Sequence, residues 1–306
     1  MVISTSLVGM TVDNIEHDVD ERWTMAYAAA LGDYLPDYFD TTGPDGIVAH
    51  PLFAVCPEWP VIVASRDYTS ELGVTPAEVL TSVHATHDTT IHRLVRPGDR
   101  LQTSLELVGL EQIHPGAKST MRIQTVDANG TPVATTTQDG IYLAQQSIGD
   151  AVPDLARPEP LVAERHGDPI EVTVPIVAGA AHTYTECARI WNPIHTDKAV
   201  AVASGLPDII LHGTANLAHG VSAVVAQRAQ RRPELVRRIS CRFAAMVRLP
   251  SVITVRVWPA REHPDGELVP FEVLNADGEP AVKDGVVLLG EPPQQPVSYG
   301  GPGASV

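Results

Sequence analysis

Stretches in which apolar and polar residues alternate run through most of this chain, and they predict β-strands with one buried face. Successive side chains of a strand point to opposite faces of a sheet, so alternation is the pattern expected there. The first half has such stretches at residues 86–93, 101–110, 121–127 and 133–143. The second half has them at residues 239–245, 252–258, 270–274 and 281–288.

Helical periodicity is scarcer and is confined to two segments, residues 20–31 and 212–228. Each carries larger apolar residues four positions apart, which places them on one face of a helix. These residues are Trp23, Tyr27 and Leu31 in the first segment, and Leu217, Val221 and Val225 in the second. The second segment is apolar on most sides, which predicts a helix wrapped by the sheet.

The chain also repeats itself. The hairpin signal Asp127-Ala128-Asn129-Gly130 has a counterpart 148 residues later in Asn275-Ala276-Asp277-Gly278. Asp139-Gly140 and Asp284-Gly285 follow in the same order, 145 residues apart. Glycine supplies the positive φ that such tight turns need. We therefore expect two related domains, residues 1–148 and 170–290, with a proline-rich linker at 149–169 and a flexible tail at 291–306.

Composition narrows the class of protein. The 306 residues carry a formal net charge of −16, whereas binding to a nucleic-acid backbone needs clustered positive charge. No apolar run reaches the roughly 18 residues of a membrane span, and the N-terminus lacks a secretion signal. The three cysteines are widely spaced, which excludes a disulfide framework and a CxxC metal site. We expect a cytoplasmic protein that binds neither nucleic acid nor membrane.

Arginines are unusually dense between residues 228 and 242. The six are Arg228, Arg231, Arg232, Arg237, Arg238 and Arg242. Guanidinium groups match phosphate oxygens, so the cluster is a candidate site for a phosphate-bearing ligand, with Arg237 and Arg238 as its centre. The other interpretation is structural: cations favour a helix C-terminus, and the remaining arginines lie in solvent.

The segment before the second long helix holds the candidate chemistry. Pro193 fixes the backbone just before His195, and Asp197 is placed to cap a short helix that Gly205 ends. His212-Gly213 then opens the long helix. Free N–H groups at a helix N-terminus polarise a carbonyl oxygen placed there. An imidazole beside them titrates near neutrality, which favours acid–base chemistry at a carbonyl compound.

Asn192-Pro193-Ile194-His195, followed after about fifteen residues by Leu211-His212-Gly213, resembles the motif of MaoC-type (R)-specific enoyl-CoA hydratases. Val83-His84 through Arg93, with Arg96-Pro97-Gly98-Asp99, resembles the first half of the two-domain members. The resemblance implies an α+β double hot-dog fold, in which each domain wraps a curved antiparallel sheet around a long helix. It also implies a substrate carried by coenzyme A or a phosphopantetheine arm, no further cofactor, and a possible homodimer.

By this resemblance, His195 is the acid/base that activates water, Asn192 orients the site, and the amide of Gly213 holds the thioester carbonyl. The first domain houses the acyl chain. One departure stands out, because the family has an aspartate five residues before the histidine and this chain has Ile190. Isoleucine neither accepts a proton nor orients water, so the standard two-residue mechanism cannot run unchanged.

Three hypotheses follow from this departure. Glu186 lies four residues before Ile190, so on a helix it would project from the same side and replace the missing acid. Alternatively, His195 alone serves a related elimination, isomerisation or cyclisation. Finally, the protein only binds an acyl thioester. We expect a hydratase or dehydratase acting on an enoyl or 3-hydroxyacyl thioester, with the other two readings as alternatives.

Neighbouring residues each have two readings. Arg189 either faces the diphosphate of coenzyme A or pairs with Glu186 one turn away. Trp191 either packs in the core or forms a wall of the acyl pocket, and His212 either points into the cleft or ties loop carbonyls. Histidine spacing predicts no metal site, and no GxSxG elbow of a serine hydrolase is present. A hot-dog thioesterase is disfavoured because the Asn-Pro-x-His turn belongs with hydratases.

Overall fold

The computed structural model describes residues 2–71 and 82–291. An 11-stranded sheet dominates it, with neighbouring strands in the order β2-β4-β5-β6-β3-β9-β13-β12-β10-β8 and β11 paired with β12. The first five are β2 (Thr11–Asp18), β4 (Arg100–Ile113), β5 (Gly116–Asp127), β6 (Pro132–Leu143) and β3 (Ser82–Ile91). The others are β9 (Val236–Phe243), β13 (Pro280–Leu289), β12 (Gly266–Leu274), β10 (Ser251–Val257), β8 (Ile170–Ile176) and β11 (Arg261–His263). Separately, β1 (Val2–Ser4) pairs in parallel with β7 (Gln146–Ile148).

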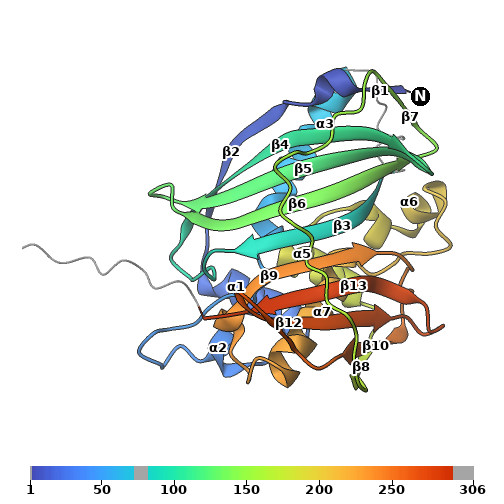
Figure 1. Ribbon diagram of the computed structural model, residues 1–306. Helices are drawn as coiled ribbons and strands as arrows, with labels where there is room; N and C mark the ends of the chain where they lie inside the picture. Colours follow the sequence, from blue (N-terminus) through green and yellow to red (C-terminus); the bar gives the residue numbers. More distant parts are fainter. Residues whose placement is uncertain (1, 72–81, 292–306) are drawn as a thin grey trace, which may run out of the picture.

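The two halves of the sheet have the same internal order. Counted outward from the central pair, the first half runs β3-β6-β5-β4-β2 and the second runs β9-β13-β12-β10-β8. In each half a long helix lies in the chain between the outermost and the innermost strand. These helices are α3 (Val55–Glu71) and α7 (Gly213–Gln227), and both lie behind the sheet in Figure 1. The tandem arrangement predicted by the sequence repeat is therefore present, and both expected hairpin turns are formed.

Local sequence explains most of the helices. Asp20 caps α1 (Glu21–Ala30) by accepting a hydrogen bond from the amide of Trp23 at 2.8 Å. Asp197 caps α6 (Lys198–Ala203) in the same way, and Gly205 follows with φ +83°. The other helices among the described residues are α2 (Pro36–Phe39) and α5 (Ala180–Ala188), with short 3₁₀ turns at Thr5–Leu7, Pro193–His195 and Pro233–Leu235.

The sequence pattern failed to predict α3. Pro57 lies within its first turn, where a missing N–H costs nothing, but Pro60 lies deeper, where proline normally breaks a helix. The helix forms because its packing against β2 and β4 outweighs this local preference. Helix α7 packs closely against β12. A Cβ added at Gly220 would lie 2.5 Å from Cε2 of Phe271.

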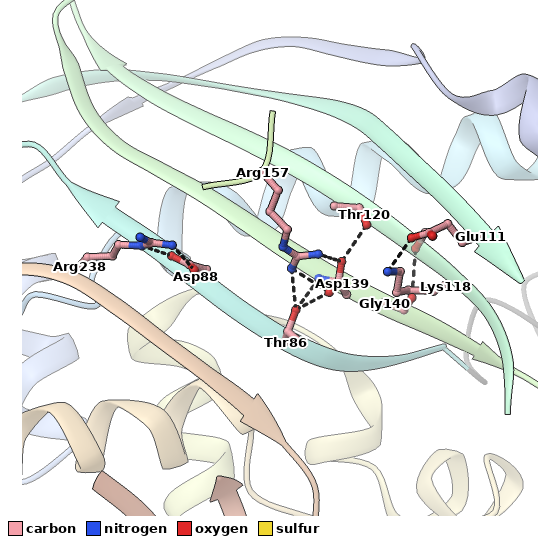
Figure 2. Close-up of polar contacts among 10 residues, drawn as sticks. Thr86, Asp88, Glu111, Lys118, Thr120, Asp139, Gly140, Arg157 and Arg238 are labelled. Atoms are coloured by element: carbon pink, nitrogen blue, oxygen red, sulfur yellow. Dashed lines mark hydrogen bonds and ion pairs between the residues drawn. The ribbon is translucent and has the colours of Figure 1, made fainter. Parts of the chain in front are cut away.

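Strands β3 and β9 pair antiparallel at the centre of the sheet and join the two halves. On the outer face, the guanidinium of Arg238 binds the carboxylate of Asp88 through two hydrogen bonds of 2.7 Å (Figure 2). The linker crosses this face: Arg157 donates to Asp139, and the carbonyl of Glu159 accepts from Arg238 at 2.9 Å. The linker is thus fixed to both halves. The predicted flexible tail lies almost wholly outside the described residues, and no described helix has the length and hydrophobicity to cross a membrane.

Candidate active site

The candidate site begins at the 3₁₀ turn Pro193–His195, which follows α5. The amide of His195 donates to the carbonyl of Asn192 at 3.1 Å, and the amide of Asp197 donates to the carbonyl of Pro193 at 2.8 Å. Asp197 then caps α6, so its carboxylate already accepts two backbone amides. These bonds tie the turn to the next helix and fix the backbone that carries the imidazole.

The imidazole of His195 is held in one tautomer. Nδ1 lies 2.8 Å from the carbonyl oxygen of Ile210. A carbonyl oxygen can only accept, so Nδ1 carries the hydrogen and Nε2 keeps its lone pair. Burial lowers the pKa of His195 to about 4, although the bond to Ile210 opposes this. The ring is therefore neutral at pH 7 and presents Nε2 as a base, with no hydrogen-bond partner for it among the described residues.

His195 stacks on His212, and this contact brings it to the start of α7. The ring centroids are 3.7 Å apart with an interplanar angle of 27°. His212 is the N-cap residue, and its Nε2 lies 3.2 Å from the hydroxyl oxygen of Thr185. Burial, together with His195, lowers the pKa of His212 well below its ordinary value. Two neutral imidazoles therefore lie side by side where α7 begins.

The N-terminus of α7 is open to an acceptor. Within the described part of the chain, the amides of Gly213 and Thr214 have no hydrogen-bond acceptor, as expected for a first helical turn. Phe243 of β9 covers Gly213 so closely that a Cβ there would lie 3.2 Å from Cδ1 of the ring. The hydroxyl of Tyr184 donates to Oγ1 of Thr214 at 3.1 Å, which fixes that side chain. A carbonyl oxygen at these amides would lie at the positive end of the helix.

The expected alignment of Glu186 with Ile190 is wrong. Helix α5 ends at Ala188, and Arg189 adopts a left-handed conformation with φ 58°. The chain therefore turns away from the helix axis before residue 190. Ile190 is buried at 6% exposure, whereas Glu186 is exposed to solvent. Among the described residues, no carboxylate is hydrogen-bonded to either stacked histidine.

The remaining predicted site residues are spread around this centre. Arg189 does not pair with Glu186, because its guanidinium lies 3.8 Å over the ring of Trp23. Trp191 is 57% exposed, so it does not pack in the core. Oδ1 of Asn192 is buried and has no hydrogen-bond partner among the residues that the structure describes.

The two predicted phosphate-binding arginines lie near the start of β9, at the other end of the strand from Phe243. Arg237 donates to the carbonyl of His92 at 2.9 Å, and its neighbour Arg238 is committed to Asp88. Three other members of the dense stretch also have partners: Arg228 donates to the carbonyl of Trp258, Arg232 pairs with Glu234, and Arg242 pairs with Asp284. This placement favours the structural reading of the arginines, because the phosphate reading of Arg238 would require breaking a half-buried ion pair.

Three residues that pack around the stacked histidines were not predicted from the sequence. Thr185 contacts His212, Tyr184 lies with its ring centroid 4.9 Å from that of His212, and Thr214 receives the Tyr184 hydroxyl. Tyr184 also lies 3.4 Å from the hydroxyl of Tyr27 on α1, which joins the two halves beside the site. The sequence offered only a weak signal for them, a tyrosine and a threonine shortly before the Asn-Pro-x-His turn.

Comparison with solved structures defines the class of this fold. A MaoC-like dehydratase from Phytophthora capsici superposes with a TM-score of 0.75 at 17% identity, covering 94% of this chain and 97% of that one. A Mycobacterium tuberculosis protein described as having a double hot-dog fold superposes with a TM-score of 0.60 at 16% identity, covering 92% and 94%. The protein is therefore a double hot-dog protein, as the resemblance implied.

Two family matches cover most of the chain. Residues 162–269 match the MaoC like domain, and residues 6–136 match the FAS1-like, dehydratase domain region. The second half of the chain is thus similar to the MaoC-like dehydratases and the first half to a dehydratase region, in line with the resemblance of the motif.

Two characterised relatives share shorter segments. The peroxisomal multifunctional enzyme type 2 of Drosophila melanogaster is 36% identical over 67 residues, which are 22% of this chain and 11% of that protein. The enoyl-CoA hydratase ChsH3 of Mycobacterium tuberculosis is 31% identical over 97 residues, which are 32% of this chain and 34% of that enzyme. The matches thus span well under half the length of either relative.

Proposed function

We propose that this protein adds water to an enoyl thioester, or removes it from a 3-hydroxyacyl thioester, with His195 leading the acid–base chemistry. The observation that carries the proposal is one juxtaposition. A neutral imidazole with a free Nε2 stacks on the residue that precedes the open amides of α7. The substrate is proposed to be an acyl group on coenzyme A or a phosphopantetheine arm, in line with the name of the hydratase relative.

Each group has a defined task in the hydration direction. The Gly213 amide donates to the thioester oxygen and stabilises the negative charge that develops there. Water forms a bond to C3 and loses one proton to Nε2 of His195. The resulting enolate then takes that proton at C2 from the imidazolium of His195, which returns the ring to its neutral form and completes the addition. Dehydration is the same sequence reversed.

Because Ile190 replaces the family's aspartate, we expect the hydration reaction to be slow. Losing one member of an acid–base pair typically costs about 10²–10⁴-fold. Glu186 does not offer an evident replacement, since it is exposed and the helix ends before residue 190. The lack of a carboxylate at position 190 also favours the second candidate, a protein that binds acyl thioesters without turning them over. Either way, the open amides of α7 are the proposed thioester contact.

The test measures loss of enoyl absorbance with crotonyl-CoA and longer enoyl-CoAs. We expect His195→Ala to abolish turnover and Glu186→Gln to leave it within about twofold. His166→Ala is the matched control, because His166 is an exposed histidine of the linker whose contact is with the carboxylate of Glu164. Ile190→Asp restores the family's carboxylate and is expected to raise the rate at least tenfold.

Other results reassign the function. If Glu186→Gln abolishes turnover, the acid is Glu186 and the single-base mechanism is wrong. If the unmodified protein never turns over but binds saturated thioesters saturably, the binding protein is the correct reading.

A further inference from the structure

A chain of buried polar side chains runs through the first half of the fold, away from the predicted motif. Oγ1 of Thr136 on β6 donates to Oε1 of Glu58 on α3 at 2.5 Å. Thr136 and Thr89 of β3 are joined by a hydroxyl–hydroxyl bond of 2.8 Å, and Thr89 in turn lies 2.8 Å from Nε2 of His87. All four residues are at most 2% exposed.

The hydrogen atoms in this chain have one consistent direction. The hydroxyl of Thr136 donates its hydrogen to Glu58, so its oxygen accepts the hydrogen bond from Thr89. The hydroxyl of Thr89 donates its hydrogen to Thr136, so its oxygen accepts the hydrogen bond from His87. Nε2 of His87 therefore carries the hydrogen, and Nδ1 is left with a lone pair. That nitrogen is buried and has no partner in the described structure, so the chain ends on an unused acceptor.

The second half shows that the fold does not require this polarity. Across the central strand pair, His87 faces Cys241 and Thr89 faces Ile239. Both facing residues of β9, Cys241 and Ile239, are buried apolar side chains. Buried polar groups cost stability unless they are satisfied, so the free acceptor at the end of this chain is suited to receive a hydrogen-bond donor.

The free end of the chain lies towards the candidate active site. An irregularity in β3 between His84 and Thr86 sets His84 beside His87, with ring centroids 5.4 Å apart. The ring of His84 lies 4.7 Å from that of Phe243, which itself covers Gly213. Nε2 of His84 is likewise buried and has no hydrogen-bond partner in the described part of the chain. A row of contacts thus connects the start of α7 with His87.

We propose that Nδ1 of His87 accepts a hydrogen bond from a hydroxyl group on the acyl part of the substrate, beyond the carbons that react. The chain from Glu58 fixes the tautomer that makes this nitrogen an acceptor. The substrate class is accordingly a hydroxylated acyl thioester rather than a plain hydrocarbon one. This inference rests on the proposed function for the thioester itself, and it assigns the first half of the fold a polar subsite.

The test is equilibrium binding, which does not depend on turnover. Calorimetric titration compares hexanoyl-CoA with saturated analogues that carry a hydroxyl at the fourth, fifth or sixth carbon. One buried hydrogen bond typically corresponds to roughly five- to tenfold in affinity. We expect at least one hydroxylated analogue to bind that much more tightly. His87→Leu should remove the preference and leave hexanoyl-CoA binding within twofold.

Two further variants keep the result interpretable. Thr89→Val retains His87 but breaks the chain, so it should also reduce the preference. Thr103→Val is the control, because Thr103 makes an equally buried hydroxyl bond to Thr125 in the same half of the sheet without joining the chain. It should leave the preference intact.

The outcomes separate the two proposals. Tighter binding of a hydroxylated analogue without any turnover of enoyl thioesters overturns the hydratase function but supports the subsite. Equal binding of all analogues, no binding of any, or a preference that survives in His87→Leu overturns the subsite.

Discussion

The most direct consequence of the buried chain concerns stability and pH, and it is tested by Glu58→Gln. Burial raises the pKa of Glu58 from 4.5 to about 7, although the hydrogen bond from Thr136 opposes the rise. Between these values the folded protein keeps a proton that the unfolded chain has released. The folded state then binds more protons, so the free energy of unfolding falls as pH rises through this window. At about 1.4 kcal/mol per pKa unit, the total fall is about 3 kcal/mol.

Glutamine keeps the shape of the protonated acid but does not titrate. We therefore expect the stability of the wild type relative to Glu58→Gln to fall by about 3 kcal/mol between pH 4.5 and pH 7, and to be constant above pH 8. Urea unfolding at half-unit pH steps measures this difference, and the histidines common to both proteins cancel. Glu106→Gln, on the exposed face of β4, is the control. A difference between wild type and Glu58→Gln that does not change with pH would refute the reasoning.

Three further predictions concern other parts of the molecule. Because burial lowers the pKa of His195 to about 4, the acid limb of kcat/KM in the proposed reaction should lie near pH 4 rather than pH 6.5, and a limb near 6.5 would contradict the assignment. Gly220→Ala should lower the free energy of unfolding by about 1–3 kcal/mol, because the added Cβ meets Phe271. Gly179→Ala, where nothing lies within 4 Å, should have little effect in the same denaturation experiment. Arg238→Met leaves Asp88 half-buried without its partner and should cost about 3 kcal/mol, whereas Arg242→Met, which breaks an exposed pair, should cost under about 1 kcal/mol.

Strands, turns and caps could be predicted from sequence because each depends on neighbouring residues. Alternation located the four inner strands of each half but missed the outermost ones, β2 and β8. The two Asp/Asn-Gly signals located their hairpins. Asp197 and Gly205 were identified correctly as helix boundaries, since capping is local chemistry. The juxtaposition of His195 with the start of α7 was also expected, because the motif's two parts imply it.

What failed depended on long-range packing or on a single unusual backbone angle. Helix α3 was missed because Pro60 disfavours a helix locally and only burial against the sheet outweighs it. Glu186 was misplaced because Arg189 adopts a left-handed conformation that glycine, not arginine, normally signals. Arg238 could not be assigned because its partner Asp88 is 150 residues away in the chain.

The pairing of β3 with β9 has a consequence for how this protein responds to its own concentration. A site built between two separate molecules is lost on dilution below their dissociation constant. In this protein the two halves of the sheet are parts of one polypeptide, so they stay together at any concentration. Each copy is also free to diverge, because a substitution in one is not imposed on the other. His87 and Cys241 illustrate such independence, because they face each other across the central strand pair and one is polar while the other is apolar.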